Sequence, residues 1–441
     1  MSPELLTIGM FGGLLVGIFL GHPLAFVLGG LSVIFAALGP GMMIMPILIG
    51  RVYSQMENYI LIAIPMFILM ARLLSDSGVT EKMFDALRLM FGRLQGGIAI
   101  AVIIISVMLA ATTGIIGASM TVMGVLALPS MLKYGYQKEL TTGVIAAGGS
   151  LGILIPPSIM LIILGSYAGV SVGQLFAAAL VPGLMLAGIY MVYVIAVTQI
   201  RPDWGPPASD EELSAVTRGE VFRMLLSSAV PPILLILGVL GSIFAGWATA
   251  TEAAAIGAAL TLALVIIYGR FSWRLLSDAL VATAKTSAMV LLVVLAATAF
   301  TGVFVAIGGT SVVSNMIDHL GLGPWATFTV MMLLVFVLGM FLDWLGIVLI
   351  CLPIFLPISN GFGFDPLWFV MMVAITLQTA FLTPPFGYAL FYLEAVAPKD
   401  VTLGHIYRGI LPFVALIVLA VILCAVFPPI ITWLPGVLFN K

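Results

Sequence analysis

Two proline pairs interrupt apolar stretches of the chain and are the residues most able to create an ion-binding site. Pro156–Pro157 lies in the first half of the chain and Pro384–Pro385 in the second. Because proline has no amide hydrogen, each pair breaks a helix and frees carbonyl groups, which inside a membrane must be buried in protein or line a cavity. Carbonyls at broken helix ends suit Na+. The candidate Na+ ligands are therefore the main-chain groups of Gly148, Leu151 and Ile153 at the first break, and of Ala380, Thr383 and Phe386 at the second.

Hydroxyl and amide side chains lie at a similar depth and could contact a substrate. The N-termini of half-helices beside them would present amides to an anion. An alternative stays open for each side chain, because buried polar groups also form hydrogen bonds between membrane helices. The Gly and Pro residues of the breaks could likewise serve only close packing or a kink. The candidate substrate contacts are Ser119, Thr121, Ser158, Gln378 and Thr379.

Asp343 is the most unusual charge in the sequence, because it lies within an apolar segment. A carboxylate at that depth costs about 2.5–3.5 kcal/mol unless it is paired or hydrated. It could attract or ligate a cation, or it could cap a half-helix that begins at Leu345, and the sequence favours neither role. The neighbouring Trp344 lies away from the interfacial positions of the other tryptophans. It could cover a substrate or fill the core.

Composition determines the surroundings of the chain. Apolar residues make up 62% and charged residues 8% of the 441 residues, and the mean hydropathy is +1.27. These values predict an all-α protein that crosses a lipid bilayer several times, and they exclude a soluble protein. The sequence contains neither a phosphate-binding GK[ST] motif nor a set of residues that could form a catalytic centre. We therefore expect a protein that is not an enzyme, does not hydrolyse ATP and has no nucleic-acid partner.

The second half of the chain repeats the first at a constant offset of 228 residues. This offset separates the two proline pairs, and it also separates Pro129 from Pro357. In each half, one apolar segment is too long for a single span and has a kink-prone middle, which predicts a re-entrant hairpin. The repeats predict a transport part made of the hairpins and broken helices, with the remainder as scaffold. The expected ranges are repeat one at 1–200 with hairpin 97–132 and broken helix 137–170, a linker at 201–223, and repeat two at 224–441 with hairpin 325–359 and broken helix 366–396.

Basic residues predict the orientation. With both hairpins re-entrant, 14 of the 16 Lys and Arg residues fall on one side, all except Arg51 and Lys441. Such an imbalance marks the cytoplasmic face, which would include the linker 201–223. The two repeats would then be inverted, with hairpin tips that approach the midplane from opposite sides. Amphipathic residues 76–96 and 269–285 are expected to form interfacial arms, although ordinary surface linkers are an alternative.

Three stretches resemble one family in particular. They are GIIGASMTVMGVLALPSMLKYGYQKELTTGVIAAGGSLGILIPPSIMLIILG, WATATEAAAIGAA, and GMFLDWLGIVLICLPIFLPI followed by TAFLTPPFGYALFYLEAVAP. Their order and sequence are similar to the large membrane subunit of tripartite ATP-independent periplasmic (TRAP) transporters. The resemblance covers essentially the whole chain. It implies an elevator-type, Na+-driven symporter in the bacterial inner membrane, which works with a small four-helix membrane subunit and a periplasmic binding protein that delivers an organic acid.

The resemblance also implies where ligands bind. One Na+ would lie by the first break near Ser119, the other by the second break near Gly346, and the substrate between them. This chain departs from many members in having Ala118 after Gly117, and Ala389 where they have Asn. These departures argue against transferring a dicarboxylate or sialic acid specificity, and the LDW and TPPFGYALFYL forms are more similar to the branch for keto acids, lactate, mannitol and chloroaromatic acids. A stand-alone Na+/carboxylate symporter is the alternative.

Overall fold

The computed structural model describes residues 2–39, 41–75, 77–113, 116–208, 217–384 and 387–439, and every regular element in them is helical. Six of these described helices are long and apolar enough to cross a membrane, or seven when the bent pair α3 and α4 counts as one span. The all-α, multi-pass fold is therefore confirmed. The helices of the first half are α1 (Pro3–Phe19), α2 (Leu24–Leu38), α3 (Met45–Met56), α4 (Ala63–Ser75), α5 (Val79–Phe91), α6 (Gly97–Thr113), α7 (Ile116–Lys133), α8 (Lys138–Ser150), α9 (Ile159–Ala168) and α10 (Val172–Ile200).

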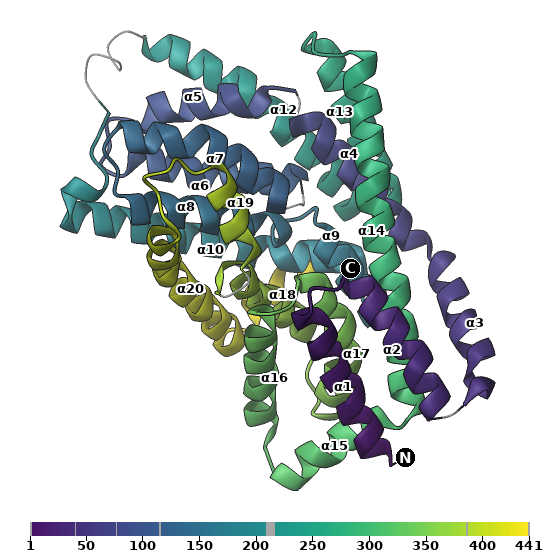
Figure 1. The fold of residues 1–441 in the computed structure, drawn as a ribbon. Coiled ribbons are helices and arrows are strands. Elements are labelled where there is room, and N and C mark those ends of the chain that lie inside the picture. The colour runs from purple at the N-terminus through teal and green to yellow at the C-terminus, as the bar shows by residue number, and fades with distance from the viewer. Residues whose placement is uncertain are drawn as a thin grey trace.

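The helices of the second half follow in the same order. They are α12 (Arg218–Phe244), α13 (Ala250–Ile267), α14 (Trp273–Ala306), α15 (Gly309–Leu320), α16 (Pro324–Gly339), α17 (Trp344–Gly361), α18 (Pro366–Leu382), α19 (Tyr388–Val396) and α20 (Leu403–Val426), and α21 (Pro429–Phe439) follows them. The offset that separates the proline pairs also maps α7 onto α17 residue for residue. Hairpin α6–α7 and hairpin α16–α17 lie in opposite halves of the molecule, as do α5 and α15 (Figure 1).

One pair of matching segments differs in shape. In the first half, α3 and the segment Tyr59–Ser75 are bent by 48°, whereas their counterpart α14 is a single helix of 34 residues. Asn58 produces the bend, because its extended backbone ends α3 and its side chain caps the next turn at Ile60 N, 3.1 Å away. The matching stretch of α14 has no Pro, and its first Gly is Gly302. The helix can therefore continue without a break.

The continuity of α14 corrects one expectation. Residues 269–285 were expected to form an arm, but from Trp273 onward they are the first turns of α14. The amphipathic helix that matches α5 is α15, which the sequence reasoning missed. The linker is also shorter than 201–223, because Thr217 and Glu220 form a capping box that begins α12 at Arg218.

The two broken helices form the centre of the fold. Every residue of α8 from Leu140 to Ser150 and every residue of α18 from Trp368 to Leu382 is buried. Two glycines let α8 cross α20 with their backbones in contact, since a Cβ built on Gly143 would lie 2.2 Å from the Gly409 carbonyl oxygen. On α18, the Trp368 indole donates a hydrogen bond to the Cys424 carbonyl of α20 at 3.2 Å. The element α20 is thus packed against both broken helices.

Candidate functional site

The first break is closed by its own hydrogen bonds. After α8, residues Leu151–Ile153 form a single 3-10 turn. Ser158 caps α9, its hydroxyl accepting from Leu161 N at 3.5 Å and donating to the Ile153 carbonyl. The Leu151 carbonyl already accepts from Leu154 N and Ile155 N, both at 3.0 Å. A carbonyl oxygen has two lone pairs and can accept two hydrogen bonds. The Leu151 carbonyl has therefore used both acceptor positions, whereas the Ile153 carbonyl keeps one free.

Gly148 lies beside an unpartnered oxygen. A Cβ built on it would come 2.6 Å from Ser106 Oγ of α6. The Ser106 hydroxyl is buried and makes no hydrogen bond within the described residues. Buried hydroxyl groups are rarely left without a partner, so this oxygen is a candidate ligand for an ion beside the first break. The sequence offered no sign of it, because a serine in a membrane helix usually bonds to its own backbone.

The second break has a similar construction. The Thr383 hydroxyl donates to the Thr379 carbonyl, and the Thr383 carbonyl accepts from Gly387 N at 3.1 Å. Ala380 packs against the end of hairpin two, where a Cβ on Gly339 would lie 2.5 Å from the Ala380 Cβ. Phe386, the third expected ligand here, lies outside the described residues. The Thr379 carbonyl also accepts from Thr383 N at 3.0 Å and so has used both positions, whereas the Thr383 carbonyl keeps one acceptor position, as the Ile153 carbonyl does at the first break.

The tip of hairpin one is packed by an aromatic ring of the second half. A Cβ on Gly117 would lie 2.9 Å from Tyr392 Cζ, so a larger residue there would require the Tyr392 ring to shift. Ser119 is buried near the first break, since a Cβ built on Gly152 would lie 3.5 Å from the Ser119 Oγ. The Thr121 hydroxyl donates to the Gly117 carbonyl at 2.7 Å, within its own helix.

Hairpin two presents Asp343 at its tip. Asp343 occupies the N-cap position of α17, where its carbonyl accepts from Ile347 N at 3.1 Å and its carboxylate interacts with the backbone N–H groups of Trp344 and Leu345. The half-buried carboxylate also lines a cavity. Gly346 does not face this cavity, because it packs against α2, where a Cβ on it would lie 2.8 Å from Leu24 Cδ2.

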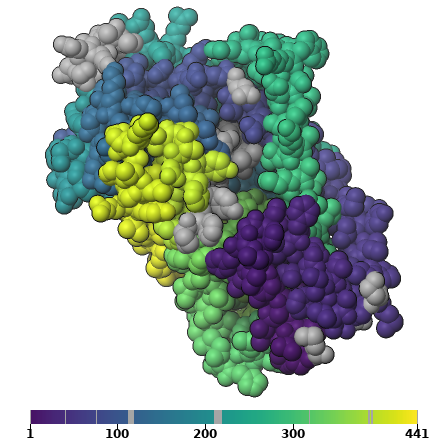
Figure 2. Space-filling view, in the orientation of Figure 1, coloured from purple at the N-terminus to yellow at the C-terminus, as the bar shows by residue number. Residues whose placement is uncertain are grey.

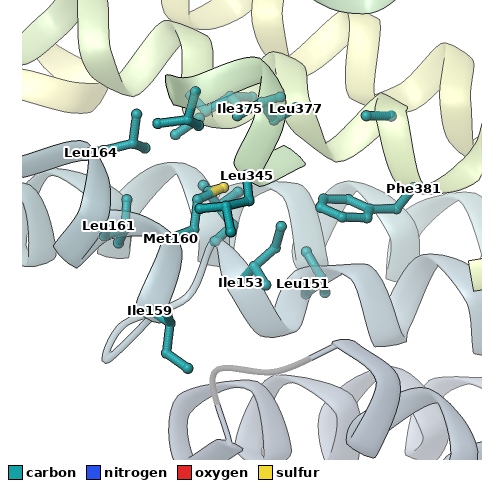
Figure 3. Close-up of a cluster of buried hydrophobic side chains, with 14 of the residues drawn as sticks. Leu151, Ile153, Ile159, Met160, Leu161, Leu164, Leu345, Ile375, Leu377 and Phe381 are labelled. Carbon is teal, nitrogen blue, oxygen red and sulfur yellow. The ribbon is translucent and has the colours of Figure 1, made fainter. Parts of the chain in front are cut away.

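The cavity has a volume of about 720 Å³ and lies where both hairpin tips and both breaks meet α2 and α14. In Figure 2 three of the elements that line the cavity, α19 in yellow, α14 in green and α2 in purple, approach one another on one face. Figure 3 shows Ile153, Leu345 and Phe381, three of the lining residues, within one cluster of buried apolar side chains. The lining residues are Pro23, Leu24, Ala25, Phe26, Gly117, Ile153, Ile159, Thr286, Ala288, Met289, Val290, Leu292, Val293, Asp343, Trp344, Leu345, Phe381 and Tyr392.

Of the expected site residues, Ile153, Asp343 and Trp344 line this cavity. The other expected residues that the structure describes are not among the lining residues. Gln378 is the most unusual of these, because its side chain is 0% exposed and neither polar atom has a partner within the described residues. The Thr379 hydroxyl donates to the Thr376 carbonyl at 2.6 Å.

Charge in and around the cavity comes from one side chain and from helix ends. Asp343 is the only charged residue among those that line it in the described part of the chain. The sequence has no Lys, Arg or His at all in 97–132, 139–170, 325–359 or 366–396. The first turns of α7, α9 and α17 supply Gly117, Ile159 and Trp344 to the lining. Helix N-termini carry partial positive charge, so they favour an anion here.

Hydrogen bonds link this core to the helices across the cavity. The Tyr167 hydroxyl of α9 lies 2.6 Å from Thr298 Oγ1 of α14, and it donates to the Val294 carbonyl at 3.1 Å. Asn58 Nδ2 donates to Ser166 Oγ at 2.7 Å. The contacts of Tyr167 join α9 to α14, and the contact of Ser166 joins α9 to the bend between α3 and α4, the segment that matches α14 in the first half.

Known proteins resemble the chain along most of its length. The family described as the tripartite ATP-independent periplasmic transporter, DctM component, matches residues 11–430. A C4-dicarboxylate TRAP transporter large permease protein of Pseudomonas aeruginosa is 30% identical over 390 residues, 88% of each chain. A sialic acid TRAP transporter large permease protein of Vibrio cholerae is 29% identical and covers 97% of this chain and 98% of its own.

A solved structure shares the fold at low sequence identity. The YdaH transporter of Alcanivorax borkumensis superimposes with a TM-score of 0.64 and 16% identity, over 98% of this chain and 100% of its own. Because the family match extends over residues 11–430 of 441, this chain belongs to the DctM component of the tripartite ATP-independent periplasmic transporters, as a large permease subunit and not an enzyme.

Proposed function

We propose that this chain is the permease of a Na+-coupled importer, which carries a small organic acid across the bacterial inner membrane. Family membership supports solute uptake within a three-part system. The partners would be a small four-helix membrane subunit and a periplasmic binding protein that delivers the acid. The coupling to Na+, the organic acid as substrate and the elevator motion rest on the physical arguments that follow.

The absence of basic side chains among the described residues that line the cavity carries this proposal. An organic anion in the cavity would meet Asp343 and no Lys, Arg or His from the lining residues that the structure describes. Helix N-termini supply only partial charges, so the balancing cations have to enter with the substrate. Oxygen ligands for Na+ are available on both sides: the Ile153 carbonyl and the unpartnered Ser106 hydroxyl near one break, and the Thr383 carbonyl at the other.

Packing also supports an elevator motion and its moving part. The expected transport part consists of 97–170 and 325–396. The backbone contact of Gly143 with Gly409 would prevent α8 from sliding along α20. We therefore include α20, and by the same repeat its counterpart α10, in the moving part. The contacts of α9 with α14 would then be the ones that break and re-form as the cavity moves.

The experiment is uptake by proteoliposomes that contain this chain and its small subunit. Uptake should require the binding protein and an inward Na+ gradient, and an interior negative potential should increase it. A tenfold gradient contributes about 1.4 kcal/mol for each Na+, and ~100 mV about 2.3 kcal/mol for each net charge. Full uptake without the binding protein would favour a stand-alone symporter, and uptake driven by protons without Na+ would refute the coupling.

A matched pair of variants tests the ion site itself. Ser106→Ala should raise the Na+ concentration needed for half-maximal uptake several-fold, because it removes a buried oxygen next to Gly148. Ser227→Ala is the control, since this exposed hydroxyl of α12 bonds only to the Met224 carbonyl of its own helix. An equal Na+ dependence in both variants would exclude Ser106 as a ligand.

A further inference from the structure

We propose that Lys285 of α14 attracts the substrate anion at the mouth of the cavity and assists its release toward the predicted cytoplasmic face. This inference rests on the proposed function and adds one residue to its release step. Lys285 is not among the residues that line the cavity, and it belongs to neither proposed Na+ site. The register of α14, the charges along it and the place of α14 in the scaffold support this role.

The register of α14 places Lys285 on the side of the helix that faces the cavity. Lys285 precedes Ala288, Met289 and Leu292 by three, four and seven residues. Residues at these spacings lie on one face of a helix, and α14 is a single helix of 34 residues without a proline. Lys285 therefore lies one turn beyond the end of the α14 wall, the part of the lining that α14 forms. This wall consists of Thr286, Ala288, Met289, Val290, Leu292 and Val293.

The Lys285 end of the α14 wall points toward the face that the basic residues mark as cytoplasmic. Arg274 lies in the first turn of α14, and Arg270 precedes the helix. Toward its other end, the Thr301 hydroxyl of α14 donates to the Leu349 carbonyl of α17 at 3.3 Å. With a rise of about 1.5 Å per residue, Lys285 lies about 24 Å along the helix axis from Thr301. The α14 wall therefore runs from hairpin two toward Lys285.

The charge of Lys285 is available to a ligand. Apart from Arg274 and Asp278, which form an ion pair at 3.9 Å, Lys285 is the only charged residue of α14. Its side chain is exposed, and it forms no ion pair within the part of the chain that the structure describes. A lysine carries a point charge on a flexible four-carbon stem, so it can follow an anion across the mouth of the cavity.

Lys285 and Asp343 act on an anion in opposite directions. Asp343 belongs to the moving part, and its ionised carboxylate repels an anion once Na+ has left the cavity. Lys285 belongs to the scaffold and offers a compensating charge just outside the lining. Because the scaffold stays in place, the moving part brings the anion close to Lys285 in only one of its two positions. Lys285 therefore assists release on one side of the membrane and leaves binding on the other side unaffected.

Cysteine reactivity measures the potential at the α14 wall without any substrate. Met289→Cys places a thiol one turn from Lys285, at a side chain that is 62% exposed. The probes are two methanethiosulfonate reagents, one with a sulfonate group and one with a trimethylammonium group. The ratio of their reaction rates cancels any change in the thiol itself. Adding Lys285→Gln should lower the anionic-to-cationic rate ratio by about threefold to tenfold, because it removes one charge about 6 Å away.

The measurement uses the purified permease with its small subunit. The chain without Met289→Cys gives the background, since both of its own cysteines are buried. Arg274→Gln is the matched control, because this exposed cation of the same helix is about 22 Å from position 289, beyond the reach of its screened charge. Lys285→Arg should keep the wild-type ratio. An unchanged ratio in Lys285→Gln would overturn the proposal and leave Lys285 as an interfacial lysine whose charge does not reach the cavity.

Uptake tests the role of Lys285 in release. In proteoliposomes supplied with the binding protein and the acid that copurifies with it, Lys285→Gln should lower the initial rate several-fold, and Lys285→Arg should restore it. The Na+ concentration for half-maximal uptake should stay the same, because Lys285 contributes no oxygen to an ion site. A lowered rate ratio at Met289→Cys with unchanged uptake would refute the role in release. The reactivity measurement needs neither Na+ nor the binding protein, so its failure is distinguishable from a failure of the proposed function.

Discussion

Replacing Gly143 by Ala should separate the two helices on which the broken-helix core depends. The added Cβ would lie 2.2 Å from the Gly409 carbonyl oxygen and 2.8 Å from Phe413 Cε2, where ordinary contact begins near 3.4 Å. Neither the backbone oxygen nor the buried Phe413 ring can turn away, so α8 and α20 must move apart by about 1 Å. Overpacking of this kind costs about 1–3 kcal/mol.

The matched control is Gly188→Ala in α10, because a Cβ at Gly188 meets nothing within 4 Å. Alanine is favoured over glycine inside a helix by about 0.5–1 kcal/mol, so this variant should gain stability. The two variants should therefore differ by about 1.5–4 kcal/mol in the free energy of unfolding.

Denaturation of both variants in the same detergent, followed by near-UV circular dichroism, measures this difference. Gly409→Ala should behave like Gly143→Ala, since its Cβ would meet the Glu139 carbonyl oxygen at 2.2 Å. The double variant should cost less than the sum of the two, because one separation relieves both clashes. If Gly143→Ala proves as stable as Gly188→Ala, the backbone contact between α8 and α20 is wrong.

Three further changes test other parts of the structure. Tyr167→Phe removes the hydrogen bond to Thr298, which is worth about 1 kcal/mol. This change should shift the ratio of the two transport conformations about fivefold, as measured by single-molecule fluorescence. An unchanged ratio would show that this contact does not break during transport. Gln378→Met removes two buried polar atoms without partners in the described residues and should raise the unfolding free energy by about 1–3 kcal/mol, whereas a loss of stability would reveal a partner. The hydrogen bond from Lys138 holds the pKa of Asp400 below its ordinary value. The stabilisation from this ion pair is therefore present at neutral pH and is lost only as the pH falls through that lowered pKa. Asp400→Asn should match wild type in relative stability at low pH, and a wild-type advantage that grows on acidification would contradict this.

The order of the helices was predictable because proline and glycine act on local backbone structure. The pair Pro156–Pro157, its repeat in the second half and the constant offset between them gave both breaks and both hairpins to within a short stretch of chain. The continuity of α14 was not predictable from apolar pattern alone, since the same residues suit a straight or a bent helix. Asn58 carried the signal for the bend in α3–α4, but a single capping residue in a polar loop is weak evidence.

The depth of the site residues in the membrane was predictable from the sequence, but the side of the helix on which each side chain lies was not. Sequence position placed Gln378 and Gly346 near the level of the breaks, yet the side of the helix that faces the cavity depends on tertiary packing. Asp343 was found because a carboxylate in an apolar segment is costly. The α14 wall was missed, because residues such as Met289 and Leu292 have the same character as residues that face lipid. Tyr392 could have been suspected from its place one turn into the helix after the second break.

The lone carboxylate in the cavity has an electrical consequence. Under the proposed elevator motion, an empty moving part with Asp343 ionised carries one negative charge at its binding site. With two Na+ and one monoanion bound, that site becomes neutral. The membrane voltage would then act little on the loaded step and mainly on the return of the empty site, at about 2.3 kcal/mol per 100 mV for a charge that crosses the whole field. In an energised cell, the negative interior would repel the empty site outward, so the unloaded permease would wait with its cavity facing the periplasm.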